Sequence, residues 1–455
     1  MRCIVEFVRV ELLRRPGPWI FLTSVILGLW LVPRFYVADL QNALVREANE
    51  IVAAPRARQV HVDAPRPGSF ADALRAPLPR YENAWKSLLD TDDARALASA
   101  VAKGERPLSD LPSNVASALP HLDADLDALL DASHVERADL GPDHDPFGPF
   151  KGTSWMGLQA AARHAALRIR TTAPNHAVHA LTDCIDGLAL GRDAAISGGL
   201  VGRMIRAAIV GLLTPSCAEA ISASDIGDAR VAGQRLRRIR DSTPSFGTTL
   251  REEGIQVQLL AYGPGLTTAM KERLLPRPRA FAEDGSMAVP GVLGPLRTRL
   301  AWRDLRKLQE RLVAIGMLPA PERDAAFAAL GTSSYLLRFL FGDLDGPEPV
   351  QSYASYSRRD AAAGLQLDLL VAAVAARDFD ARRGRWPSSV AELVADGLLD
   401  PDEARRLARA ILDEQRPGRE LKLIVPVPKA AAGDLGEAIV RVSRTEYDAA
   451  VPRRD

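Results

Sequence analysis

Over most of this chain, apolar residues recur among polar ones with the spacing of an α-helix. Apolar side chains recur every three or four positions, as at Leu40, Leu44 and Ala48, and this spacing predicts amphipathic helices. Joints rich in Pro, Gly or Ser separate the expected helices, which cover residues 81–103, 113–133, 154–172, 174–192, 200–222, 225–241, 245–275, 295–315 and 360–383. Short joints favour antiparallel neighbours, so the expected body is a multi-helix bundle or an array of helical hairpins.

The last hundred residues change pattern. A short helix is expected near residues 401–415, followed by two β-like runs over 420–427 and 437–443. In the first run Leu421, Leu423 and Val425 alternate with other residues, as the two faces of a strand require. The fold class is therefore mainly α, with a small C-terminal α/β module.

An uncharged apolar run near the N-terminus predicts a transmembrane anchor. The run covers residues 16–32 and reaches Val37 if the side chain of Arg34 extends toward the headgroups. About 22 helical positions span roughly 33 Å, enough to cross a bilayer. Trp19 near one end and Tyr36 near the other fit the aromatic belts of membrane interfaces. We therefore expect a transmembrane helix over residues 16–37.

Arginines around this run predict its orientation. Four precede it and two follow it closely, namely Arg2, Arg9, Arg14 and Arg15 against Arg34 and Arg46. Because positive charge is retained on the cytoplasmic side, the N-terminus is expected in the cytoplasm and the body outside it. A cleaved signal peptide is the alternative, with cleavage after Ala38, although Tyr36 fits the small-residue position poorly.

Prolines and glycines divide the rest of the chain. Five prolines between residues 54 and 79 predict a linker or an irregular wrap. The expected parts are a cytoplasmic N-terminus (1–15), the anchor (16–37), a stalk with N-terminal helices (38–150), a helical body (151–345) and the α/β module (346–455).

Charge and composition exclude some functions. The 58 basic and 57 acidic residues nearly cancel over 455 residues, so no overall field attracts nucleic acid. Only seven of the basic residues are lysine, which with the Ala-rich helices is typical of a high-GC bacterial genome. The sequence indicates no nucleic-acid partner.

A short C-terminal segment carries a resemblance. Residues Gly384–Leu393 read GRWPSSVAEL, which resembles the G-R-[YW]-P-x-S-x-x-E-L signature that follows a long helix in many bacterial extracytoplasmic proteins. Ser389 and Glu392 also form a capping-box pattern, with Gly397 placed to end the next helix.

With the anchor and the apolar segment 198–213, the chain resembles uncharacterised bacterial single-pass membrane-anchored proteins with a large helical extracytoplasmic body. The signature is distantly similar to one in pseudopilins, but VELLRRPGPW before the anchor lacks a prepilin cleavage site. The resemblance implies location in the cell envelope and no particular activity.

One helical face offers metal-ligand residue types. His176, His179 and Asp183 lie at positions i, i+3 and i+7 and share a face. An ordinary polar face explains the same residues, and the chain contains no HExxH or other recognisable ligand pair. No catalytic residue, cofactor or metal site is therefore assigned from the sequence.

Three further groups have ordinary explanations. Glu253 falls on an apolar stripe, where it is expected to pair with an arginine such as Arg303 or Arg306, or to be buried with a raised pKa. Arg235, Arg237, Arg238 and Arg240 are expected on a solvated face rather than at a phosphate site. Asp143, His144 and Asp145 fit turn chemistry better than a cation site.

Cys184 and Cys217 are candidates for a disulfide. Cys3 precedes the anchor, so these two cysteines are the ones expected in an oxidising compartment. A helical hairpin centred near residue 197 leaves Cys217 about seven residues, or roughly 10 Å, away from Cys184. A helix ending near Leu213, before Pro215, would let residues 214–217 fold back and close that distance. Two buried free thiols are the alternative.

These patterns predict a non-enzymatic protein of the bacterial inner membrane that binds a partner or helps to assemble the envelope. The alternative is a cell-envelope enzyme with a site near His176, His179 and Asp183.

Overall fold

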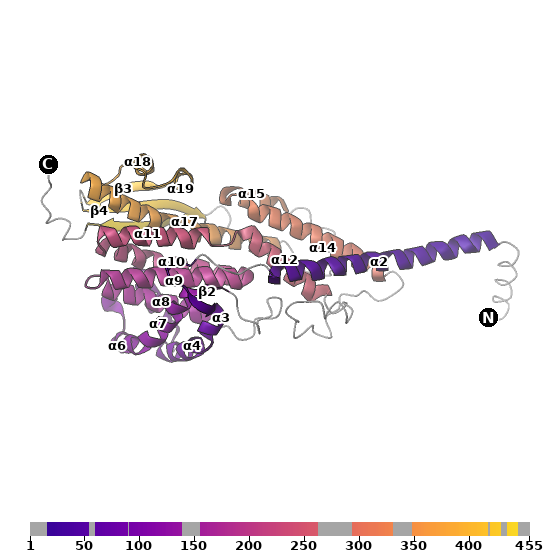
Figure 1. Cartoon of the computed structure of the whole chain (residues 1–455), viewed down its shortest axis with the longest axis horizontal. Coiled ribbons are helices and arrows are strands. Elements are labelled where there is room, and N and C mark those ends of the chain that lie inside the picture. The colour runs from indigo at the N-terminus through magenta and orange to yellow at the C-terminus, as the bar shows by residue number, and fades with distance from the viewer. Residues whose placement is uncertain are drawn as a thin grey trace.

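The computed structural model describes residues 16–53, 60–89, 91–138, 155–262, 294–330, 348–416, 419–428 and 435–444. The protein is mainly helical, with a small antiparallel sheet near the C-terminus. Figure 1 shows an elongated molecule in which one long helix projects from a compact body. That helix is α2 (Pro16–Ala53), and it contains both the expected anchor and the expected stalk.

The N-terminal part of the body forms a small lobe of short helices. Its α-helices are α3 (Phe70–Arg75), α4 (Pro77–Leu88), α5 (Asp92–Ala102), α6 (Ser113–Ala118) and α7 (Asp123–Asp131). Its 3-10 turns are η1 (Leu108–Asp110), η2 (Leu119–Leu122) and η3 (Ala132–His134), and strands β1 (Arg66–Ser69) and β2 (Val135–Arg137) pair in parallel.

The prediction of an irregular linker over residues 54–79 is wrong for its second half. Ser69 accepts a hydrogen bond from the backbone of Asp72 and starts α3. Pro77 and Pro79 then occupy the first turn of α4, where a missing N–H costs nothing because no intrahelical acceptor exists for it. Prolines here begin a helix instead of interrupting one.

Long helices build the rest of the body. They are α8 (Trp155–Thr172), α9 (Ala177–Ser197), α10 (Gly199–Ala223), α11 (Ile226–Asp241), α12 (Phe246–Tyr262), α14 (Gly294–Met317), α15 (Ala320–Leu330) and α17 (Glu348–Arg383). Helix α17 begins 12 residues before the expected start at 360. The described part of the 245–275 prediction ends at Tyr262.

Helix α10 is the centre of the core. It packs against α8, α9 and α17, and its side chains join one continuous apolar cluster with those helices and the sheet. Among the described residues, α10 is the helix with the length and mean hydropathy to cross a membrane, and 61% of its most apolar stretch is buried inside the protein. This helix lies mid-chain, not at the N-terminus, and its burial fits a core helix.

The α9–α10 hairpin has a different register from the one expected. Gly187 contacts Leu213 and Gly191 contacts Ile209, so these pairs are centred on residue 200 and not on 197. Gly199, at φ +54°, lets α10 start directly after the turn. When the centre of the hairpin moves by about three residues, the residue of α10 that lies opposite a given residue of α9 moves by about six. This removes most of the mismatch of about seven residues expected between Cys184 and Cys217.

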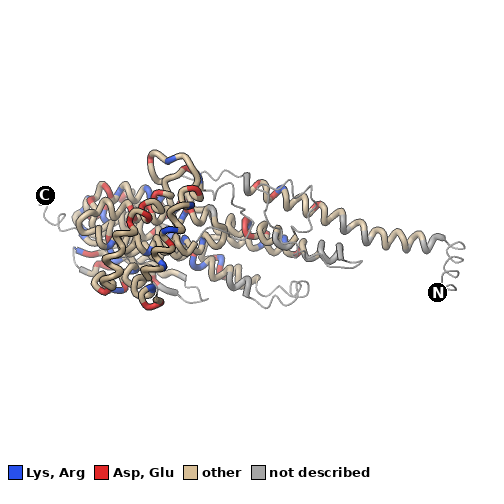
Figure 2. The backbone as a smooth tube through the Cα atoms, turned by 90° about the horizontal axis from the view of Figure 1, so that it is seen from below, with Lys and Arg blue, Asp and Glu red and all other residues tan. Residues whose placement is uncertain are grey.

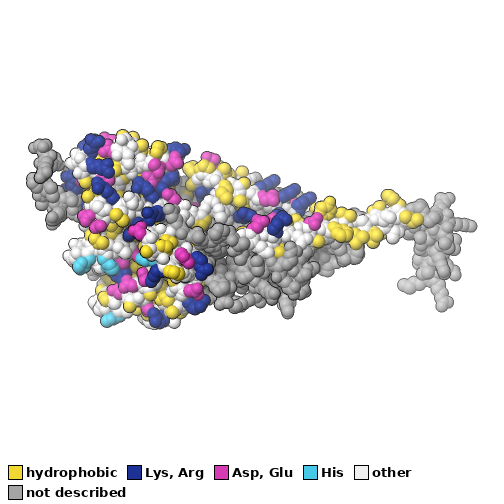
Figure 3. Space-filling model, viewed as in Figure 1, with side chains coloured by type: hydrophobic (Ala, Val, Ile, Leu, Met, Phe, Trp, Pro, Cys, Tyr) yellow, Lys and Arg dark blue, Asp and Glu magenta, His cyan; other side chains and the backbone are white. Residues whose placement is uncertain are grey.

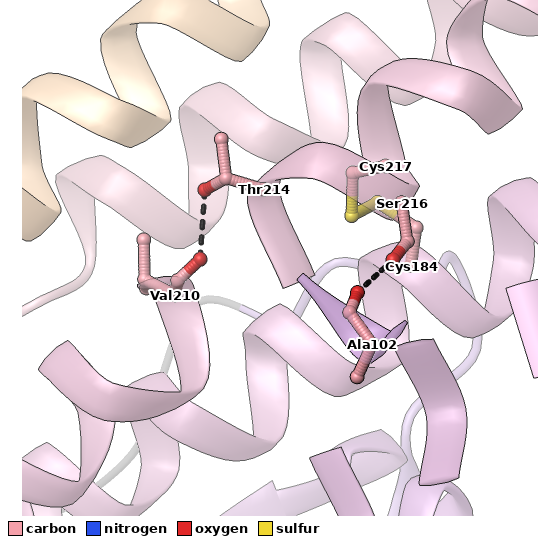
Figure 4. Close-up of a disulfide and its surroundings, with 6 residues drawn as sticks. All are labelled: Ala102, Cys184, Val210, Thr214, Ser216 and Cys217. Carbon is pink, nitrogen blue, oxygen red and sulfur yellow. Dashed lines mark hydrogen bonds between the residues drawn. A yellow bond between two sulfur atoms is a disulfide. The ribbon is translucent and has the colours of Figure 1, made fainter. Parts of the chain in front are cut away.

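This register brings the cysteines together. Cys184 and Cys217 form a disulfide with Cα atoms 5.3 Å apart (Figure 4). The helix expected over residues 200–222 is confirmed, because α10 continues through Pro215 to Ala223, so the end near Leu213 that would have let residues 214–217 fold back is not formed. Thr214 donates a side-chain hydrogen bond to the carbonyl of Val210, and Ser216 donates one to Ala102 of the N-terminal lobe. Helix register, not a break at Pro215, explains the bond.

The C-terminal part contains α18 (Val390–Ala395), α19 (Pro401–Arg406) and three antiparallel strands in the order β3 (Ile411–Arg416), β4 (Glu420–Pro428) and β5 (Leu435–Ser443). The predicted helix over 401–415 is wrong in its second half, which is β3. This strand is an edge strand rich in Asp, Glu and Gln, so it lacks the apolar alternation of β4. Leu421 and Leu423 of β4 are buried in the core cluster.

The capping box expected at Ser389 is not formed. Ser389 makes no side-chain cap bond, and Glu392 instead accepts hydrogen bonds from the backbone of Ser388 and from Arg385. A complete capping box lies at the next helix, between Asp400 and Glu403. Gly397, at φ +70°, follows α18 as expected.

The disulfide should stabilise the body. Loss of the 33-residue cross-link, in Cys184→Ala or Cys217→Ala, should lower the free energy of unfolding by roughly 3 to 4 kcal/mol, since the unfolded chain regains loop entropy. Urea unfolding of the full chain measures this change, and Cys3→Ala serves as the control. Thiol labelling of the unfolded, unreduced protein should find one reactive thiol; three would contradict the bond.

Candidate functional site

The helical face with metal-ligand residue types, His176, His179 and Asp183, does not converge on one point. Asp183 accepts two hydrogen bonds of 2.8 Å from the Arg168 guanidinium, one on each carboxylate oxygen. The side chain of His179 is 55% exposed, and its Nε2 lies 3.8 Å from the same carboxylate. His176 is the N-cap residue of α9. Arg168 occupies both oxygens of Asp183, so Asp183 and Arg168 form an ion pair, with His179 nearby. The three residues His176, His179 and Asp183 are therefore not a set of metal ligands.

One turn further along α9, Asp186 meets two histidines that sequence reasoning did not single out. His61 Nε2 lies 2.6 Å from Asp186 Oδ1, and His134 Nε2 lies 2.9 Å from the same oxygen. The two imidazole rings stand edge to face with centroids 5.1 Å apart. Within the described parts of the chain, these three residues are the group whose metal-ligand atoms all lie within 4.8 Å of one another. We refer to them as the His–His–Asp cluster.

Three separate segments position the cluster. His61 lies in the non-helical segment before β1, His134 ends η3, and Asp186 lies in the middle of α9. The side chain of His61 is fully buried, and that of Asp186 is nearly so. Asp131 lies on the outer side of the cluster, with Oδ1 3.7 Å from Nδ1 of His134.

Burial sets the charges in the cluster. It lowers the pKa of His61, and the hydrogen bond with Asp186 opposes this shift only in part. Burial alone would raise the pKa of Asp186, but hydrogen bonds with His134 and His61 outweigh it and lower that pKa. At neutral pH a carboxylate therefore faces the neutral imidazole of His61.

Sequence spacing could not reveal this cluster. Asp186 lies 125 residues from His61 and 52 from His134, so no local motif links them. One weak signal exists, since His61 stands between Val60 and Val62, although polar residues flank this triplet on both sides. Two neighbouring valines suggest partial burial but name no partner.

A second buried cluster surrounds Asp360 of α17. Arg203 of α10 binds both of its oxygens, at 2.7 and 3.0 Å, while Arg206 approaches within 3.3 Å and Arg323 of α15 within 3.6 Å. The guanidinium groups of Arg203 and Arg323 also each lie 5.6 Å from the ring centre of Phe246. This cluster joins three helices through one carboxylate.

Charge balance in this cluster depends on Asp360. Burial would raise its pKa, but Arg203 and Arg206 outweigh burial and lower it. Burial lowers the pKa of Arg206 to about 10, so Arg206 is still charged at neutral pH. Without the carboxylate, several guanidinium groups would share a buried space with no counter-charge.

The remaining sequence candidates have structural roles. Glu253 does not pair with the expected arginines: burial raises its pKa, and it accepts a hydrogen bond from the backbone of Leu200 at the start of α10. Arg303 pairs with Asp304, and Arg306 with Glu47. Asp143, His144 and Asp145 lie outside the described residues.

The arginine run on α11 is not simply a solvated face. Arg237 and Arg240 both bind the buried Glu403 of α19, and Arg240 also lies 3.1 Å from Asp368 of α17. Arg238 makes a looser pair, 3.9 Å from the exposed Asp63. These arginines attach the C-terminal helices to the body.

Comparison with protein-family models, with curated proteins and with solved structures gives no match. The candidate site therefore stands on the geometry of this chain.

Removal of the Asp360 charge should destabilise the body strongly. Asp360→Asn should lower the free energy of unfolding by about 3 to 5 kcal/mol at pH 7, since it leaves buried guanidinium groups without a counter-charge. Asp324→Asn is the matched control: Asp324 pairs with Arg358 at 3.3 Å but is 42% exposed, so the loss should stay below about 1 kcal/mol.

The same change has a defined pH dependence. The folded-state pKa of Asp360 is lowered, so its contribution is fully present above the unfolded value near pH 3.9 and is lost as pH falls through the folded pKa. Urea unfolding should therefore separate wild type from Asp360→Asn at pH 7, and the two should converge only well below about pH 4. Equal, small losses in both variants would argue against the charge cluster.

Proposed function

We propose that this chain is a single-pass membrane protein that holds a partner-binding helical body outside the cytoplasm of a bacterium. The observation that carries the proposal is the outer half of α2. Large apolar side chains there face solvent, for example Ile20 at 63%, Phe21 at 72% and Phe35 at 70% exposed. Figure 2 shows this half projecting from the body, and Figure 3 shows hydrophobic side chains over much of its described surface. A lipid bilayer is the environment that makes such exposure favourable.

Exposed apolar residues are concentrated on this segment. Of the fourteen large apolar side chains that are exposed among the described residues, eight lie between Ile20 and Tyr36. The other six are scattered singly over the body, as is normal for a globular surface. The concentration supports a membrane-spanning role for residues 16–37.

The inner half of α2 supports a stalk. Leu44 and Ala48 are fully buried in a small apolar cluster with Leu259 of α12 and Trp302 of α14. Tyr262 stacks on Trp302 with ring centres 4.4 Å apart. Residues 38–53 extend about 24 Å at the rise of an α-helix, which would hold the body at that distance from the membrane.

Two features favour an extracytoplasmic body. The arginines around the anchor place the N-terminus in the cytoplasm by the positive-inside rule. The Cys184–Cys217 bond also requires an oxidising compartment to persist, such as the bacterial periplasm.

Binding of an envelope protein is favoured over catalysis at the predicted face. An enzyme near His176 would need Asp183 as a free ligand or base, yet Arg168 binds both of its oxygens. The alternative of an enzyme at this face therefore has less support. The near-zero net charge leaves nucleic acid without an electrostatic basis for binding.

Topology tests the proposal. Alkaline phosphatase fused after Asp455 should be active, because it needs an oxidising compartment, and a cytoplasmic fluorescent reporter at the same position should be dark. The protein should stay in carbonate-washed membranes at full length. An inactive phosphatase with a bright fluorescent fusion would reverse the orientation, and release of a chain beginning near Asp39 would indicate a cleaved signal peptide.

A substitution in the stalk tests its packing. Leu44→Asp places a charge in the cluster around Trp302 and should raise amide exchange along residues 38–53, α12 and α14, while α8 to α10 keep their protection. Asn42→Asp, at an exposed position of the same helix, is the control and should leave the exchange pattern unchanged. Unchanged exchange in Leu44→Asp would show that the stalk does not depend on this contact.

A further inference from the structure

We propose that the His–His–Asp cluster, His61, His134 and Asp186, binds a first-row divalent metal ion, with Zn²⁺ as the ion it fits best. Its ligand atoms converge within 4.8 Å from three separate segments of the body. The proposal concerns the body alone, so it stands whether or not α2 crosses a membrane.

Charge compensation is the first argument. Each of the other buried acids in the described chain has a guanidinium partner, in the pairs Asp183–Arg168, Asp193–Arg192, Asp360–Arg203, Asp368–Arg240, Asp378–Arg230 and Glu403–Arg237. The hydrogen-bond partners of Asp186 are imidazoles. A buried carboxylate without a cation is costly, and a divalent ion between the three side chains would supply the missing charge.

Ligand chemistry is the second argument. Two imidazole nitrogens and one carboxylate oxygen suit Zn²⁺ and its first-row neighbours, whereas Mg²⁺ and Ca²⁺ prefer oxygen ligands throughout. Asp131, 3.7 Å from Nδ1 of His134, lies where an outer carboxylate commonly orients a metal-bound histidine.

The cluster needs only a small movement to admit an ion. With metal–ligand bonds of about 2.0 to 2.1 Å, ligand atoms of a tetrahedral site stand about 3.3 Å apart. His61 Nε2 and Asp186 Oδ1 are now 2.6 Å apart, and His134 Nε2 is 2.9 Å from the same oxygen. His61 lies outside the helices, in a segment of bends, so its position can adjust without breaking helical hydrogen bonds.

A bound ion would act as a clip. It would join the segment before β1, the N-terminal lobe and α9, and it would add to the apolar core that the lobe and α9 already share. His61 lies eight residues beyond the end of α2 at Ala53, so the clip would fix the chain close to where it leaves the stalk.

Metal content of the full chain decides the proposal. The detergent-extracted protein, treated with a chelator and then titrated with Zn²⁺, should bind one equivalent with a dissociation constant of about 1 μM or tighter, and its unfolding midpoint should rise with Zn²⁺. His61→Ala, His134→Ala and Asp186→Asn should each weaken binding by more than about 100-fold, since loss of an outer partner alone costs about 10- to 100-fold.

His179→Ala is the matched control, because it removes an exposed histidine from the same helix, and it should bind Zn²⁺ like the wild type. Circular dichroism shows whether each variant is folded. If a variant unfolds, the wild type still gives the answer: no stoichiometric Zn²⁺ and no shift in its unfolding midpoint would overturn the proposal. Loss of Zn²⁺ in His179→Ala would also overturn it, by moving the metal to the face of His176 and Asp183.

Discussion

The pairing of buried charge is the constraint on which the rest of this structure depends. Arginine and acidic side chains enter the core from many helices, and each would be costly there without a partner. The pairs join different elements: Arg168 of α8 with Asp183 of α9, and Arg203 of α10 with Asp360 of α17. Such pairs give little net stability compared with apolar packing, but a helix displaced by one turn would leave charges buried and unpaired. We infer that they fix which helices are neighbours.

Helical periodicity predicts the helices of this fold but not how they meet. The spacing of apolar residues gave most of the long helices, because a buried stripe recurs every three to four residues. Apolar spacing missed β3, because the charged sequence of this edge strand does not alternate apolar and polar residues. The prolines suggested an irregular linker at residues 54–79, where Pro77 in fact begins α4. For β3 the deciding factor is a neighbour in space, β4, whereas for the expected linker it is local: Ser69 caps α3, and Pro77 fits the first turn of α4.

The candidate site was still less predictable. Helical spacing places three candidate ligands, His176, His179 and Asp183, on one face. In the structure, however, the guanidinium of Arg168 in α8 binds the carboxylate of Asp183. The His–His–Asp cluster, in contrast, draws one residue from each of three segments, and only the tertiary fold aligns them. The disulfide lies between these extremes: compartment and cysteine count suggested Cys184 and Cys217, while the hairpin register that joins them depends on glycine contacts that spacing does not reveal.

Helix α9 connects the two sides of the body through residues two positions apart. Successive residues of an α-helix turn by about 100°, so Cys184 and Asp186 lie on nearly opposite faces. Cys184 bonds α9 covalently to α10 in the core, and Asp186 holds His61 and His134 on the other face. The chain reaches His61 soon after it leaves α2, while α2 itself packs on α12 and α14. The stalk is therefore attached to the body through the apolar cluster of Leu44, and the polar cluster of Asp186 holds the chain again at a position eight residues beyond the end of α2.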